Sequence, residues 1–183
     1  MKVINTYSFK RGEKFLKAKH PKELSEVLQA IKNLDAIKCL TKESAEKTMK
    51  GALLFSPRDM NHHLKTALHK KNWTAKASDK KKEYAEPRHA FGGGRFREMD
   101  GMKNKVGLEI QFGKYAFMFY DMAKFQYFFN ENKADVGIEI VPCHAMHKQM
   151  STGVSCGQQL VYDIERVKRH FPAVPVKIVL IDV

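Results

Sequence analysis

Asp100, Glu109 and Gln111 have the clearest chemical potential in the sequence, within the stretch MDGMKNKVGLEIQFGKY. Glu109 lies in an apolar run, where an ionised carboxylate is costly unless a partner compensates its charge. A tight turn over residues 101–105 would fold Asp100 back beside Glu109. Two adjacent carboxylates repel each other unless a cation lies between them, and oxygen ligands of this kind favour Mg²⁺.

Beside a phosphodiester, such a metal can activate water and stabilise the charge of the transition state. The pattern of an acid, a turn and then Glu109-x-Gln111 therefore predicts a nuclease-like metal site, in which Asp100 and Glu109 hold the metal. An alternative stays open at this point. Glu109 could face solvent from an edge strand, and Asp100 could be an ordinary turn residue.

The elements around these residues predict a sheet that would hold them rigidly. Side chains alternate along a strand, so Glu109 and Gln111 should share one face, opposite Leu108 and Ile110. We expect strands over 106–112, 136–142 and 174–183, and helices over 115–130 and 157–170. Strands that alternate with helices after residue 100 indicate an α/β protein with a mixed central β-sheet flanked by helices.

The first half of the chain has a different pattern. PKELSEVLQAIKN (21–33) predicts an amphipathic helix that begins at a proline, and 61–72 predicts a second helix with a basic face. We expect a single endonuclease domain over 1–183, with an N-terminal helical part (1–73), a basic glycine-containing loop (74–97) and the catalytic sheet and helices (98–183).

Composition limits the class of protein and its partners. The chain has 183 residues, and 33 Lys and Arg against 20 Asp and Glu give a net charge of +13. This excess favours a polyanionic partner such as DNA. No stretch has the length of apolar sequence that a membrane span needs, and no secretory signal is evident. Three widely separated cysteines fit free thiols in the cytoplasm.

The cysteines also raise the question of zinc. Cys143, His144, His147 and Cys156 do not have the spacing of a familiar structural zinc site. The sequence therefore favours a buried cysteine and loop histidines at these positions.

The run VGLEIQFGKYAF, with Asp100 before it, resembles the active-site hairpin of the BstYI/BglII group of type II restriction endonucleases. TKESAEKT followed by GALLFSP, DVGIEIVP and MSTGVS resemble other segments of this group in the same order. The resemblance implies the PD-(D/E)xK nuclease fold, with Asp100 and Glu109 as the metal-binding acids. Gln111 stands where most nucleases of this fold have lysine. An amide cannot take up a proton, so Gln111 should orient the attacking water.

The resemblance also implies how DNA is recognised and cut. Such enzymes are homodimers that cut palindromic double-stranded DNA, here with a GATC core, and leave 5′-phosphates and four-base 5′ overhangs. Lys114 and the loop residues Ser151, Thr152 and Ser155 are implied to contact DNA. A cognate DNA methyltransferase is expected in the host. Two alternatives stay open: a repair or structure-specific nuclease of the same fold, and a non-catalytic basic DNA-binding protein.

Overall fold

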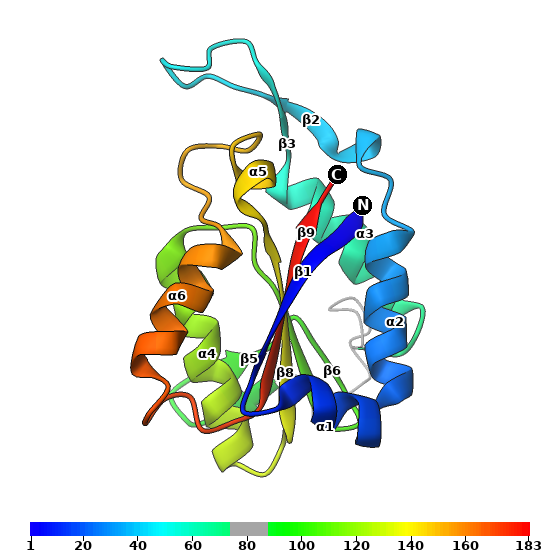
Figure 1. Ribbon diagram of the computed structural model, residues 1–183, viewed down its shortest axis with the longest axis vertical. Coiled ribbons are helices and arrows are strands. Elements are labelled where there is room, and N and C mark those ends of the chain that lie inside the picture. Colours follow the sequence, from blue (N-terminus) through cyan, green and yellow to red (C-terminus); the bar gives the residue numbers. More distant parts are fainter. Residues whose placement is uncertain (74–87) are drawn as a thin grey trace.

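A five-stranded mixed sheet forms the centre of the protein (Figure 1). The structure is a computed structural model that describes residues 1–73 and 88–183. The strand order is β1-β9-β8-β7-β6, and β7, β8 and β9 run parallel while β1 and β6 pair antiparallel at the two edges. The strands are β1 (Lys2–Phe9), β6 (Gly101–Lys103), β7 (Val106–Ile110), β8 (Val136–Pro142) and β9 (Val176–Asp182). Every residue of β7 and β8 is buried, as is typical of central parallel strands.

Helices cover both faces of this sheet (Figure 1). α4 (Tyr115–Asn130) packs on β8 and α6 (Gly157–Val167) packs on β9, while α1 (Gly12–Lys19) and α2 (Pro21–Lys32) cover the opposite face. α3 (Pro57–His69) packs against α2 and begins at Ser56, whose hydroxyl accepts a hydrogen bond from the Asp59 amide. Within the described residues, no helix has the length and apolar character needed to cross a membrane.

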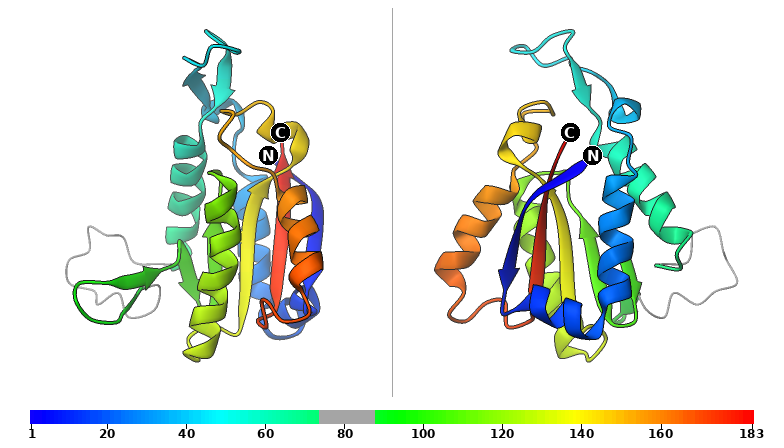
Figure 2. Two further views of the ribbon diagram at one scale, coloured as in Figure 1. Left: turned by 90° about the vertical axis from the view of Figure 1, so that its left-hand side faces the viewer. Right: turned by 45° about the vertical axis from the view of Figure 1, so that its right-hand side comes forward.

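Two hairpins project from this body (Figures 1 and 2). The first pairs β2 (Leu40–Glu43) with β3 (Leu53–Phe55), directly after the short helix η1 (Ile37–Cys39). The second pairs β4 (Arg88–Ala90) with β5 (Phe96–Glu98). A single-turn helix, α5 (His144–His147), follows β8 and lies near the first hairpin (Figure 1).

The predicted α/β class and the mixed sheet flanked by helices are confirmed, as are the helices at 21–33 and 115–130. The description of 1–73 as a helical part is incomplete: the segment contains α1, α2 and α3, but β1 also supplies an edge strand to the central sheet. The expected loop over 74–97 is wrong for its last part, where Gly92, Gly93 and Gly94 adopt positive φ and turn the β4–β5 hairpin. The part of this prediction that falls on 74–87 lies outside the described residues.

Two glycines let α4 approach the sheet closely. Gly107 on β7 and Gly137 on β8 are neighbours in the parallel register. A Cβ on Gly137 would lie 2.7 Å from the Phe125 ring of α4, and one on Gly107 would lie 2.5 Å from Met99 Sδ and 3.4 Å from the same ring. The absence of these two side chains lets Phe125 pack directly on the strands, which brings the polar residues of α4 over the sheet.

Gly137→Ala should therefore destabilise the protein by about 1–3 kcal/mol, because the added methyl group overlaps a ring that is fully buried. Urea unfolding of the variant measures this change. Gly153→Ala is the matched control, since a Cβ there meets no atom within 4 Å. Equal stability of the two variants would contradict the packing argument.

Candidate active site

The β6–β7 hairpin brings Asp100 back beside β7. Its two-residue turn has positive φ at Asn104 (47°) and Lys105 (62°), the geometry that matches the twist of paired strands. Gly101 pairs with Leu108, and Asp100 Oδ2 accepts a hydrogen bond from the Ile110 amide at 2.9 Å. The predicted return of Asp100 beside the Glu109 strand is confirmed.

Glu109 is buried within this sheet, with 2% of its surface exposed. β7 lies between β6 and β8, so the alternative of a solvent-facing edge strand is wrong. The Lys124 ammonium, from α4, lies 2.5 Å from Glu109 Oε1 and 2.9 Å from Asp121 Oδ1. Glu109 Oε1 nevertheless makes no aligned hydrogen bond. A buried carboxylate in an apolar strand is thus compensated by a cation from the helix above it.

Gln111 lies on the same side of the sheet as Glu109, as predicted. Its Nε2 donates to Asp121 Oδ2 at 2.8 Å, and its Oε1 accepts from the Gly113 amide at 3.0 Å. The strand itself ends at Ile110, although the Gln111 amide still donates to the Ile140 carbonyl at 2.9 Å. Asp121 therefore fixes the orientation of the Gln111 amide, and Lys124 fixes Asp121.

Asp100 has a cationic partner from the other half of the chain. Lys65 Nζ, on α3, lies 2.7 Å from Asp100 Oδ1. Asp100 and Glu109 thus each face a lysine. Burial raises the pKa of Glu109 well above its usual value, and the charges of Asp121 and Asp100 raise it further, against the lowering effect of Lys124. Carboxylate oxygens from Asp100 and Glu109 are the kind of donor that a hard divalent cation prefers.

A third buried acid, Glu139 on β8, lies next to Glu109 in the parallel register. Glu139 is completely buried, and neither of its carboxyl oxygens has a hydrogen-bond partner among the described residues. Burial raises its pKa well above 4.5, and the charges of Asp121 and Glu109 raise it further. Burial alone would lower the pKa of Lys124, but the Glu109 and Asp121 carboxylates outweigh this effect and keep the ammonium protonated. Glu139 therefore keeps its proton to a higher pH in the folded protein than in the unfolded chain.

Sequence reasoning missed Lys65, Asp121, Lys124 and Glu139. Two signals were present. Asp121 and Lys124 interrupt an otherwise apolar and aromatic helix, and VGIEI repeats the pattern of VGLEI, so that Glu139 occupies the same place as Glu109. The charges on α4 and the glutamates on two strands could thus have been paired before the fold was known.

The residues expected to contact DNA differ in accessibility. Lys114, directly before α4, and Thr152 are exposed, and Ser151 is half-buried with its hydroxyl bonded to Lys42 of β2. Ser155 is buried, its amide donates to the Gly113 carbonyl at 3.0 Å, and its hydroxyl lies 3.3 Å from Gln159 Oε1. The loop therefore reaches from the β2–β3 hairpin to the residues just after Gln111.

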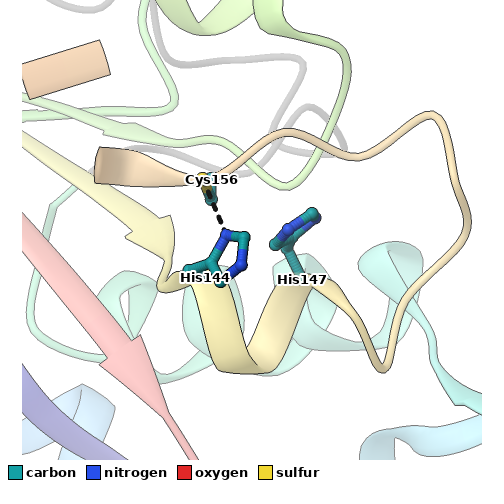
Figure 3. A group of neighbouring side chains, drawn as sticks. All are labelled: His144, His147 and Cys156. Atoms are coloured by element: carbon teal, nitrogen blue, oxygen red, sulfur yellow. Dashed lines mark hydrogen bonds between the residues drawn. The ribbon is translucent and has the colours of Figure 1, made fainter. Parts of the chain in front are cut away.

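The expectation of loop histidines needs correction, because His144 and His147 lie on the single-turn helix α5. His144, His147 and Cys156 lie together, because the loop after α5 returns the chain to the start of α6 (Figure 3). Cys143 is separate and buried, as predicted, and its sulfur accepts a hydrogen bond from the Met146 amide at 3.3 Å.

The raised pKa of Glu139 predicts how stability depends on pH. The folded protein retains a proton that the unfolded chain releases above about pH 4.5, so wild-type stability falls as the pH rises toward the folded-state pKa. Glu139→Gln mimics the protonated form and should be roughly 1–4 kcal/mol more stable than wild type near pH 8. The gain should shrink toward zero near pH 4.

Urea unfolding in a chelating buffer at both pH values measures this difference. Glu131→Gln, at an exposed position just after α4, is the control and should change stability by less than about 0.5 kcal/mol at either pH. A Glu139→Gln variant that is less stable than wild type at pH 8 would contradict the raised pKa of Glu139.

Comparison with known proteins bears on the family and the fold of the chain. The model of the family described as restriction endonuclease BglII/BglIII matches residues 4–181. The solved structure of BglII complexed with a DNA 16-mer is 18% identical and superposes with a TM-score of 0.78, covering 100% of this chain and 79% of BglII. Free BglII is 16% identical with a TM-score of 0.68, covering 100% of this chain and 80% of that one. No curated protein matches the sequence.

The family match spans almost the whole chain, and the likeness in structure extends to the BglII restriction endonuclease fold. The chain therefore belongs to the BglII/BglIII family of restriction endonucleases, and it is a type II site-specific deoxyribonuclease.

Proposed function

We propose that this endonuclease hydrolyses phosphodiester bonds of double-stranded DNA with Mg²⁺ held by Asp100 and Glu109. The observation that carries the proposal is the β6–β7 hairpin, which ties Asp100 to the Ile110 amide at 2.9 Å, directly beside the buried Glu109. When bound, the metal would activate a water molecule and stabilise the charge that develops on the phosphate.

Gln111 has a positioning role in this proposal. Its amide cannot accept a proton, so it does not act as a general base. The Gln111 side chain donates one amide hydrogen to Asp121 and uses one oxygen lone pair to accept a hydrogen bond from the Gly113 amide. The second hydrogen and the second lone pair stay available to orient a water molecule at the metal. Lys124 supports both Glu109 and Asp121, so it links the metal-binding acid to the water-positioning amide.

The DNA substrate follows from the family and the charge. BglII has been solved with a DNA 16-mer, which supports a double-stranded substrate for this chain. We propose a palindromic site with a GATC core, cut to give 5′-phosphates and four-base 5′ overhangs. Lys114, Ser151 and Thr152 are available for DNA contacts, and the buried Ser155 is assigned here to holding the loop against Gly113.

We further propose a homodimer, because a palindromic site is matched by two-fold protein symmetry. Exposed aromatic side chains on α4 and α6 could form its interface: Phe117 is 57% exposed, Tyr120 42% and Tyr162 56%. The pairing of β1 with β9 joins both ends of the chain in one sheet and supports a single endonuclease domain over 1–183. Free thiols at Cys39, Cys143 and Cys156 suit the cytoplasm, where a cognate methyltransferase would protect host DNA.

Incubation of unmethylated plasmid with the protein and Mg²⁺, followed by sequencing of the ends, tests the function. We expect discrete fragments with four-base 5′ overhangs at a GATC-centred palindrome. Asp100→Asn and Glu109→Gln should each lower the cleavage rate by more than about 100-fold, because loss of a metal ligand should cost at least as much as loss of an outer partner. Glu165→Gln, on the surface of α6, should cut at the wild-type rate.

Two other outcomes of this cleavage experiment would support the alternative functions. Smeared products that still depend on Glu109 would indicate a nuclease of this fold without a fixed palindrome. Intact plasmid from folded protein, across several divalent metals, would indicate a non-catalytic DNA-binding protein.

A further inference from the structure

His144, His147 and Cys156 form a compact group of nitrogen and sulfur donors between α5 and α6 (Figure 3). One ligand atom from each residue lies within 4.8 Å of those from the other two. His144 Nδ1 is 3.9 Å from Cys156 Sγ, and the two imidazole centroids are 4.9 Å apart. His144 is exposed and the other two side chains are half-buried, so the group is open to ions from solution.

The local fold explains why these three side chains meet. α5 is a single turn, so residues three positions apart project from the same side of it. The chain then passes through residues 148–155 and returns to the first turn of α6, where Cys156 is the N-terminal flanking residue. The group thus joins the two ends of the loop that carries Ser151 and Thr152.

The donor set suits a borderline metal ion and not the hard cation assigned to Asp100 and Glu109. Two imidazoles and one thiolate are common ligands of tetrahedral Zn²⁺, with Zn–N near 2.0–2.1 Å and Zn–S near 2.3 Å. Those bond lengths place tetrahedral donors about 3.3–3.7 Å apart. The 3.9 Å contact is close to this value, and all three ligand atoms lie within 4.8 Å of one another, so closure would need movements of about 1 Å.

We propose that His144, His147 and Cys156 bind one Zn²⁺ ion, with water in the fourth position. This ion would connect the two ends of the 148–155 loop. The inference is independent of the function proposed for Asp100 and Glu109, because it rests on other residues and another class of donor.

The zinc site would act on a loop that already contacts the β2–β3 hairpin region and the residues just after β7. The Gln149 carbonyl accepts from the Phe55 amide at 2.9 Å, and the Thr152 amide donates to the Glu46 carboxylate at 3.2 Å, both within the β2–β3 hairpin region. Ser155 bonds to Gly113, just after the catalytic strand. Zinc would hold the loop between these two supports and so order Ser151 and Thr152.

Metal binding to the chelator-treated, full-length protein tests the proposal. Titration with Zn²⁺ should give one tight site per chain. Titration with Co²⁺ should give a sulfur-to-cobalt charge-transfer band and the visible bands of tetrahedral cobalt. His144→Ala and Cys156→Ser should each weaken Zn²⁺ binding at least tenfold, and Cys156→Ser should abolish the charge-transfer band. His170→Ala changes an exposed histidine outside the group and should bind like wild type.

A double variant, Asp100→Asn with Glu109→Gln, separates the two metal sites and should keep the zinc site intact. Amide hydrogen exchange gives a second measurement, in which Zn²⁺ should slow exchange across 148–156 in wild type but not in Cys156→Ser. The proposal is overturned by the absence of binding, by a charge-transfer band that survives Cys156→Ser, or by binding lost only in the double variant.

Discussion

The ion pair between Lys124 and Glu109 is the interaction on which the candidate active site depends. A carboxylate in the middle of a fully buried strand would be strongly unfavourable without a cation within contact distance. α4 supplies that cation, and its approach is possible because Gly107 and Gly137 leave room for Phe125 on the strands. The helix α4 therefore supplies both the apolar packing on the strands and the cation that compensates the charge of Glu109.

The same helix connects the metal-binding and water-positioning parts of the site. Lys124 contacts both Glu109 and Asp121, and Asp121 accepts from Gln111, so these four side chains form one network. Asp100 is held differently, by a backbone amide of β7 and by Lys65 from α3. The N-terminal half of the chain therefore contributes charge to the site as well as shape. A rigid sheet with supporting partners is what precise placement of metal ligands requires.

Sequence reasoning reached those parts of the site that depend on short-range pattern. Alternation along 106–111 predicted that Glu109 and Gln111 share a face, and the turn residues predicted the return of Asp100. β1 was missed because it is an edge strand in which Phe9 is the one buried residue, so its sequence has no long apolar run. Lys124, Asp121 and Glu139 required knowledge of which helix covers which strands. The group of His144, His147 and Cys156 required knowledge of where the loop after α5 returns, which spacing alone cannot give.

Anomalous diffraction from crystals soaked in Mn²⁺, a scatterer that substitutes for Mg²⁺, tests the central claim most directly. The account predicts a peak bound by the carboxylates of both Asp100 and Glu109, with Lys65 and Lys124 moved from their present contacts with these oxygens or sharing them. A crystal in which Mn²⁺ occupies other sites, while neither carboxylate binds metal and both keep their present lysine contacts, would contradict the account.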